Sequence, residues 1–169
     1  MDYEHIIHSF DPVFDKNSRI LIMGSMPSVK SRECGFYYGH PRNRFWTVIS
    51  AITGSPLPHS TEDKKKLLLD HGIAIWDTAA ECDIIGSSDQ KIKNVVPTDL
   101  RIITDKCNIE AIFANGAAAA NMYRKYQKHT LGKEIMILPS TSPANAAWST
   151  ERLIKEWSKI REYLQKNDL

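Results

Sequence analysis

The sequence has few cysteines, and no two of them lie close together. Cys34, Cys82 and Cys107 are the three, and none belongs to a C-x-x-C motif. An odd and scattered count argues against a disulfide framework and against a zinc or iron–sulfur site with four thiolate ligands. The chain also lacks an H-E-x-x-H motif or a paired His/Asp cluster. We therefore expect reduced thiols, no metal and no cofactor.

Long hydrophobic runs are also missing. No stretch approaches the apolar length that is needed to span a bilayer. Residues 1–14 carry acidic side chains early and have no apolar signal core. These absences predict a cytoplasmic protein that has no membrane partner.

The chain has almost no excess of charge of one sign. It carries 22 Lys and Arg against 20 Asp and Glu, a formal charge of +2. A polycation is thereby excluded, so any binding to nucleic acid must come from a local basic patch. Its 169 residues, 42% of them hydrophobic, suit one soluble domain covering residues 1–169. We expect this domain to be a monomer.

Three common fingerprints of phosphate or acyl chemistry are absent. No G-x-G-x-x-G follows a strand, and neither a G-x-x-x-x-G-K-[ST] loop nor a G-x-S-x-G nucleophile motif occurs. A hydrolase or nucleotide-binding enzyme that uses Ser140 and His40 therefore remains an alternative without a supporting motif.

Apolar runs alternate with segments of helical spacing along the chain. The runs predict buried strands at 19–24, 73–77, 109–114 and 135–138. Helices are predicted at 43–52, 61–71, from 97 or 98 to 106, at 117–128 and at 150–166. This alternation predicts an α/β fold, a single three-layer α/β/α domain with a central four-stranded parallel sheet.

The polar loops that follow the predicted strands point to the position of a site. They are residues 25–42, 77–90, 115–116 and 139–145. In an open parallel sheet, ligands bind beyond the carboxyl ends of the strands. All four loops leave the sheet at that edge, so their residues are candidates as a group. The rule places a site but names no reaction.

Three ordered motifs carry a resemblance to a known family. They are Gly24-Ser-Met-Pro-Ser28, Tyr37-Tyr-Gly-His-Pro-Arg-Asn-Arg-Phe-Trp46 and Leu138-Pro-Ser-Thr-Ser-Pro-Ala-Asn145. Together they resemble the uracil-DNA glycosylase superfamily, and within it the hypoxanthine (deoxyinosine) DNA glycosylases. The segments 77–82 and 86–89 are similar to that group as well. The resemblance spans most of the chain and implies a uracil-DNA glycosylase-like domain.

The resemblance also implies an activity. A monofunctional DNA glycosylase would flip out a deaminated base, hypoxanthine and possibly uracil, and hydrolyse its N-glycosidic bond. An abasic site would remain, as in base excision repair. The partner would be double- or single-stranded DNA containing a deaminated base. No lysine Schiff base is indicated, so we expect no strand cleavage by the enzyme itself.

The resemblance assigns roles to residues of the first two motifs. Asn43 would be catalytic, either donating to the base or orienting water, and its position also suits a helix N-cap. The proposed base-binding residues are Tyr38, with Tyr37 as the alternative stacking aromatic, Ser25, Met26 and His40. Ser25, Ser28 and Asp89 are equally explained as caps or turn formers.

DNA contacts are expected from the loops as well. The proposed DNA-binding residues are Lys30, Arg42, Arg44, Ser140, Ser142, Pro143, Ala144 and Asn145. The basic side chains would contact phosphates, the polar ones of the third motif would bond to them, and Pro143 with Ala144 would wedge into the base stack.

The sequence departs from the mismatch-specific relatives at two positions. Met26 stands where they have an activating Asn, and Leu138 where they have a polar residue. Neither side chain donates a hydrogen bond. This departure motivates an alternative interpretation, a DNA lesion-binding protein of the same fold without strong catalysis.

Overall fold

Four parallel strands form the centre of the computed structural model, which describes residues 2–164. They are β2 (Ile20–Gly24), β3 (Ile73–Asp77), β6 (Ala111–Asn115) and β7 (Ile135–Leu138), in the spatial order β3-β2-β6-β7. Every residue of β2 and β3 is buried, as expected for strands that are covered on both faces. The predicted four-stranded parallel sheet is confirmed.

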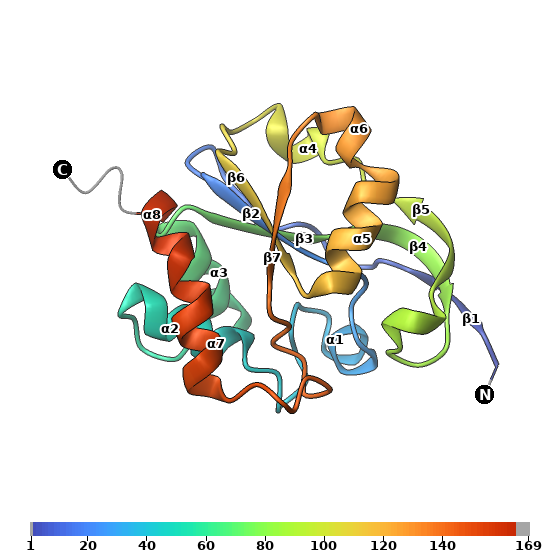
Figure 1. Cartoon of the computed structure of the whole chain (residues 1–169), viewed down its shortest axis with the longest axis horizontal. Helices are drawn as coiled ribbons and strands as arrows, with labels where there is room; N and C mark the ends of the chain where they lie inside the picture. Colours follow the sequence, from blue (N-terminus) through green and yellow to red (C-terminus); the bar gives the residue numbers. More distant parts are fainter. Residues whose placement is uncertain (1, 165–169) are drawn as a thin grey trace.

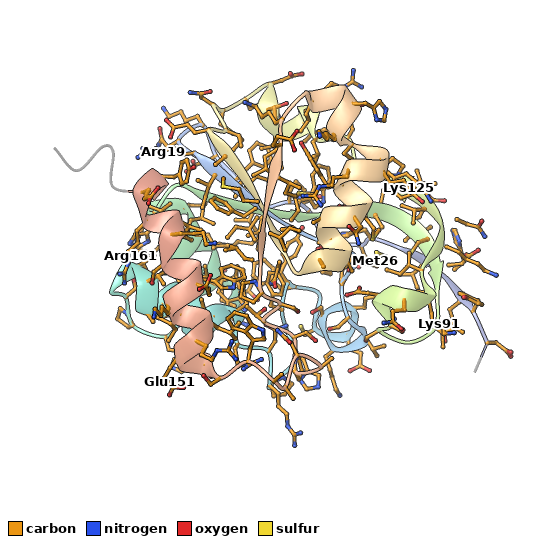
Figure 2. The ribbon with its side chains drawn as sticks, in the orientation of Figure 1. Arg19, Met26, Lys91, Lys125, Glu151 and Arg161 are labelled. Carbon is orange, nitrogen blue, oxygen red and sulfur yellow. The ribbon has the colours of Figure 1, made fainter. Side chains whose placement is uncertain are left out.

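Helices cover both faces of this sheet, which gives three layers (Figure 1). One side carries α2 (Phe45–Thr53), α3 (Thr61–Asp70), α7 (Thr150–Trp157), the short η2 (Ser158–Ile160) and α8 (Arg161–Leu164). The other side carries α4 (Arg101–Thr104), α5 (Ala117–Tyr126) and α6 (Lys128–Leu131). Charged side chains such as Lys91, Lys125 and Glu151 lie on the outside of the ribbon (Figure 2).

A second, antiparallel sheet extends beyond the first and is not predicted by the sequence pattern. It consists of β1 (Glu4–Ile7), β4 (Ala79–Ile84) and β5 (Lys93–Pro97), in the order β1-β4-β5. The prediction of a polar loop over 77–90 is therefore wrong for 79–84. In β4, Cys82 and Ile84 are buried while Glu81 and Asp83 alternate with them, the period-2 pattern of a half-buried strand.

Two predicted helices are shorter than expected. Pro97 belongs to β5, and only Arg101–Thr104 of the segment 97–106 forms an α-helix. The long C-terminal helix is interrupted at Ser158, whose hydroxyl donates to the carbonyl of Ile154 at 2.6 Å. Such a bond competes with the helical backbone and often bends it. Residues 165 and 166 of that prediction lie outside the described residues.

The register of the parallel strands aligns their carboxyl ends. Gly24 pairs with Asp77, and Asn115 pairs with Leu138. The long loop after β2 contains the short α1 (Val29–Cys34), and η1 (Asp89–Lys91) follows β4. These segments and the loop after β7 gather at this edge of the sheet (Figure 1). Within residues 2–164, no helix has the length and apolar character to cross a membrane.

Candidate active site

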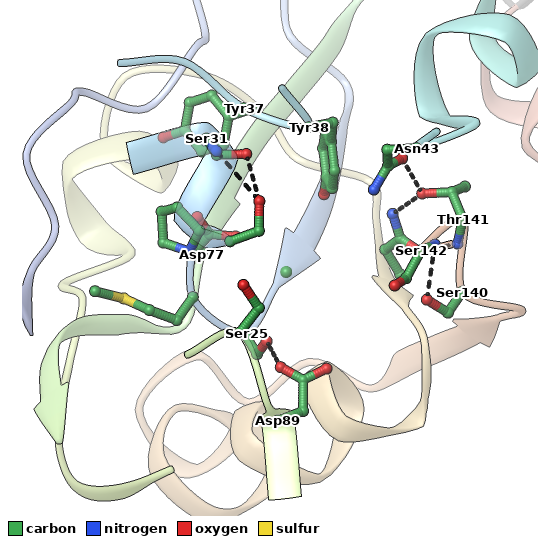
Figure 3. A pocket seen from close by; sticks show the side chains of 16 residues that line it. Ser25, Ser31, Tyr37, Tyr38, Asn43, Asp77, Asp89, Ser140, Thr141 and Ser142 are labelled. Carbon is green, nitrogen blue, oxygen red and sulfur yellow. Dashed lines mark hydrogen bonds between the residues drawn. The ribbon is translucent and has the colours of Figure 1, made fainter. Parts of the chain in front are cut away.

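A polar pocket opens at the carboxyl edge of the parallel sheet (Figure 3). Its lining comes from the last residues of β3 and β6 and from the segments that follow β2, β4 and β7, and it includes Ser25, Tyr38, Asn43, Asp77, Asp89, Asn115 and Thr141. The cavity volume is about 120 Å³. A single water needs only roughly 10–15 Å³ of such space, so the pocket has room for a much larger group. Within residues 2–164, no group of three or more His, Cys, Asp or Glu side chains could hold a metal ion.

Asn43 has a fixed amide orientation. Its Oδ1 accepts the backbone N–H of Phe45 at 2.9 Å and the hydroxyl of Thr141 at 2.8 Å. A backbone N–H can only donate, so the atom that it meets must be the amide oxygen. The Nδ2 group consequently points to the pocket side, away from Thr141 (Figure 3). Asn43 therefore offers a donor to whatever enters the pocket.

A hydrogen-bond chain from β6 fixes this orientation. Asn115 at the end of β6 donates from Nδ2 to Oγ1 of Thr141 at 3.0 Å, and its Oδ1 accepts the Thr141 N–H at 2.9 Å. Because the Thr141 hydroxyl has a single proton, accepting from Asn115 leaves that proton for Asn43. Thr141 is fully buried. The three side chains form a directional relay that ends at the pocket.

Tyr38 presents its hydroxyl to the pocket. The hydroxyl is buried and has no hydrogen-bond partner within residues 2–164. Burial raises the pKa of this phenol, the negative charge of Asp77 raises it further, and the nearby Asn115 amide opposes the shift only in part, so the hydroxyl keeps its proton. One face of the ring stacks on Phe45, with the ring centroids 4.0 Å apart. The backbone φ of Tyr38 is +52°, a conformation that non-glycine residues rarely adopt. Stacking of a base on the ring stays a prediction.

Asp77 lies on the floor of the pocket and is hydrogen-bonded to His8. Its Oδ2 accepts from Nε2 of His8 at 2.8 Å, and both side chains are about 95% buried, being 5% and 4% exposed. No hydrogen bond to Oδ1 of Asp77 occurs within residues 2–164. A β-carbon on Gly24 would lie 2.2 Å from that oxygen and 3.5 Å from the Tyr38 hydroxyl. Because Gly24 has no β-carbon, the acceptor Oδ1 of Asp77 and the donor hydroxyl of Tyr38 can both lie close to the space above its backbone.

Ser25 and Asp89 form a second polar pair in the pocket. The Ser25 hydroxyl donates to Oδ1 of Asp89 at 2.5 Å. Burial raises the pKa of the Asp89 carboxyl, the bond from Ser25 opposes that shift, and the charge of Asp77 adds to it. Met26 also lines the pocket, while its side chain packs in a small apolar cluster with Cys82 and Ile84.

Arg44 makes several hydrogen bonds within the protein. Its guanidinium donates to the carbonyl oxygens of Trp148, of Asn145 at 3.0 Å and of Ser142 at 3.4 Å. Its backbone N–H donates to the carbonyl of Thr141 at 3.1 Å. Arg44 therefore joins the start of α2 to the loop after β7, and its contact to DNA stays a prediction.

The remaining predicted site residues do not all reach the pocket. His40 is not among the lining residues, and its Nδ1 accepts the N–H of Arg42 at 3.0 Å within a turn. Arg42 is exposed. Lys30 is exposed too and lies 3.3 Å from the carboxylate of Glu33. Their contacts to DNA stay predictions.

The side chains of the loop after β7 mostly shape the loop itself. Ser140 accepts the N–H of Ser142 at 3.1 Å, Ser142 accepts that of Ala144 at 3.2 Å, and Asn145 donates to the carbonyl of Ser140 at 2.9 Å. Ser140 and Ser142 also line the pocket. Pro143 is half-buried and Ala144 is exposed. The exposed tip leaves Ala144 accessible to a macromolecule.

We expect the Arg44→Met substitution to destabilise the protein. Hydrogen bonds to charged groups contribute about 1.5–3 kcal/mol each, and methionine leaves the loop carbonyls without their donors. The expected loss of unfolding free energy is about 2 kcal/mol, measured by urea denaturation. Arg42→Met is the matched control, because Arg42 is exposed, and should stay within about 0.5 kcal/mol of the parent protein. Equal stability of the two variants would show that the hydrogen bonds from Arg44 to the loop carbonyls do not stabilise the protein.

Sequence reasoning missed several residues of this site. Asn115 was covered only by the general rule that loops at the carboxyl edge converge, and Asp77 belonged to the segment 77–82 that carries the resemblance but had no role assigned to it. Thr141 occurs in the third motif, and nothing distinguished it from its serine neighbours. His8 comes from the amino-terminal segment, and no pattern in the sequence connects it to Asp77, 69 residues later.

A family model and two named proteins match most of this chain. The model of the family described as "Uracil DNA glycosylase superfamily" matches residues 12–165. A protein named "Hypoxanthine DNA glycosylase" from Methanosarcina acetivorans is 33% identical over 157 residues, which cover 92% of this chain and 98% of that protein. A second protein of that name, from Methanosarcina barkeri, is 33% identical over 138 residues, or 80% of this chain and 86% of that protein.

The fold also has a match among solved structures. A solution NMR structure from Methanosarcina acetivorans, described as a candidate uracil DNA glycosylase, superimposes with a TM-score of 0.77 at 33% identity. The superposition covers 92% of this chain and 96% of that one.

Proposed function

This chain belongs to the uracil-DNA glycosylase superfamily and is a DNA N-glycosylase, and we propose that it hydrolyses the bond between hypoxanthine and deoxyribose in DNA. The observation that carries the choice of base is the set of polar groups left without partners in the pocket. Oδ1 of Asp77 is an acceptor, the Tyr38 hydroxyl is a donor, and Nδ2 of Asn43 is a second donor.

The edge of hypoxanthine complements the first two of these groups. Hypoxanthine carries a carbonyl oxygen next to a ring N–H, whereas adenine carries an amino group next to a ring nitrogen with a lone pair. Asp77 accepts the ring N–H and Tyr38 donates to the carbonyl, since both converge over Gly24. Adenine would place its lone pair against the carboxylate of Asp77 and leave that buried acceptor unpaired, which is costly. Uracil shares the N–H and carbonyl pair and is the second substrate that we propose.

Asn43 then acts on the leaving base. Breaking the glycosidic bond places positive charge on the sugar and negative charge on the base, and a fixed donor at that position stabilises the transition state. The relay from Asn115 through Thr141 holds the amide so that no reorganisation is needed. The hydrogen bond from His8 to Oδ2 of Asp77 holds this carboxylate in place beside the base.

The proposed product is an intact strand with an abasic site. Among the described residues, no lysine lines the pocket, so the site lacks an amine for a Schiff base. Water is therefore the nucleophile, and the reaction is the first step of base excision repair. Because the bond is buried in a duplex, the nucleotide must be flipped into the pocket first.

Contacts to the DNA backbone complete the proposal. Lys30 and Arg42 are exposed on the loop that also carries Tyr38 and Asn43, and they supply charge to phosphates there. Ser140, Ser142 and Asn145 fix the shape of the loop after β7, while Pro143 and Ala144 at its tip enter the base stack. Arg44 supports this loop from within.

A substrate panel tests the proposed function. Excess protein is incubated with labelled DNA that contains hypoxanthine, uracil or a G·T mismatch, each in a duplex and in a single strand, and abasic sites are cleaved with alkali. We expect alkali-dependent cleavage that is fastest for hypoxanthine and slower for uracil, with no cleavage before alkali. Tight binding without cleavage of any substrate would favour a lesion-binding protein.

A further inference from the structure

Two carboxylates line the pocket, and they lie at different depths. Asp77 lies on the floor, over Gly24, and its Oδ2 accepts a hydrogen bond from His8. Asp89 lines the pocket and also a second, more open groove beside the loop after β7, which includes Ser140 and Trp148. Asp89 therefore lies at the mouth, where the pocket meets the groove. A base held on the floor leaves its sugar at this mouth.

The attacking water needs a hydrogen-bond acceptor near the sugar. Met26 has none to offer in the first motif, because its side chain packs in an apolar cluster. Asn43 cannot serve either, since Phe45 and Thr141 already occupy its amide oxygen. Asp77 is turned to the base. Among the described lining residues, Asp89 is the carboxylate that remains, and Ser25 occupies only its Oδ1.

We propose that Asp89, oriented by Ser25, is the catalytic residue that positions the attacking water and accepts its proton; this inference rests on the proposed function. The water oxygen forms a bond to C1′ of the deoxyribose, and the bond between C1′ and the base nitrogen breaks with its electron pair on the base. One proton of the water passes to Oδ2 of Asp89. The released base takes up a proton, and Asp89 returns its proton to the solvent.

The surroundings of Asp89 suit a general base, the group that accepts the proton of the water. Asp89 as a whole residue is exposed at the mouth, but partial burial of its carboxyl in the pocket and the charge of Asp77 raise the pKa of this group, which makes its ionised form a better proton acceptor than a fully solvated carboxylate. The charged groups that share its two cavities are Asp77 of β3 and Glu156 of α7, and Lys91 lies two residues further along η1. Because the ionised form is the active one, the rate should fall as the pH drops through the raised pKa.

The test compares Asp89→Asn with the parent protein in single-turnover release of hypoxanthine from a duplex. We expect a rate about 10²-fold lower, the smaller end of what a general base contributes. The fall in rate at acidic pH should disappear in the variant, and affinity for the duplex, measured by fluorescence anisotropy, should stay within about threefold (about 0.65 kcal/mol). Asp70→Asn, on the exposed end of α3, is the matched control and should behave as the parent protein.

Variants of Ser25 separate positioning from folding. Ser25→Ala should slow the reaction. The fall in rate at acidic pH should also move to higher pH, because the hydroxyl that lowers the pKa of Asp89 is lost. Ser25→Thr keeps a hydroxyl and should return the fall in rate to the pH at which the parent protein shows it. The role of Asp89 is overturned, while the proposed function stands, if the parent protein releases hypoxanthine and Asp89→Asn is equally fast. The same holds if Asp89→Asn shows the same fall in rate at acidic pH. If the parent protein releases no deaminated base, both fall.

Discussion

Replacing Asn43 with alanine slows the release of hypoxanthine about 10² to 10³-fold, the loss that follows removal of one donor aimed at a developing charge. The Nδ2 group of Asn43 faces the pocket, and alanine leaves nothing in its place. The measurement is the single-turnover rate with a duplex that contains hypoxanthine. Binding of the duplex should change far less, because the donor acts on the transition state more than on the bound base.

Asn43→Asp separates catalysis from helix capping. Asn43 also accepts the N–H of Phe45 at the start of α2, and loss of such a cap costs about 1 kcal/mol of stability. Aspartate keeps this acceptor but replaces the donor with a second acceptor. We therefore expect Asn43→Asp to be as slow as Asn43→Ala while it unfolds at a higher urea concentration. A fast Asn43→Asp variant would show that capping, and not the amide donor, is what matters.

Changing Asp77 to alanine alters which bases are accepted. With the parent protein, 1-methylhypoxanthine should be released about 10²-fold more slowly than hypoxanthine, because the methyl group removes the ring N–H and leaves a buried carboxylate unpaired. In Asp77→Ala no carboxylate remains to be paired, and the methyl group gains space. The ratio of the two single-turnover rates should then fall to within about tenfold.

The control for this change is Asp83→Ala. Asp83 lies on β4 and bonds to His5 at 2.8 Å and to Asn94 at 2.7 Å, away from the pocket lining. Its removal should leave the ratio for the two bases unchanged. The ratio is used because Asp77→Ala also separates a buried pair with His8 and should lower stability and overall rate. An unchanged ratio in Asp77→Ala would mean that this carboxylate does not contact the ring N–H.

The parallel sheet was predictable because its strands are continuous apolar runs. Ile20–Gly24 and Ile73–Asp77 are buried on both faces, so composition alone reveals them. The segment Ala79–Ile84 resembles a loop in sequence because Glu81 and Asp83 make it polar, although they alternate with buried Cys82 and Ile84. A half-buried strand depends on its partners, and here these are β1 and β5.

The site was predictable in position but not in detail. The rule for parallel sheets placed the loops after the four strands at one edge, and the pocket lies there. It could not reveal that Arg44 donates to carbonyls about a hundred residues later, or that Asp89 accepts from Ser25. An arginine on a loop and an aspartate in a turn look the same in sequence whether they face solvent or a partner. Only the fold brings those partners together.

The most direct test of the account is to identify the released base. A duplex containing hypoxanthine is incubated with excess protein, and free hypoxanthine is quantified by mass spectrometry beside the alkali-labile sites in the same DNA. We expect equal amounts of the two with the parent protein and neither above background with Asn43→Ala on the same timescale. A parent protein that binds this duplex and releases no base, or an Asn43→Ala variant that releases it at the parental rate, would contradict the account.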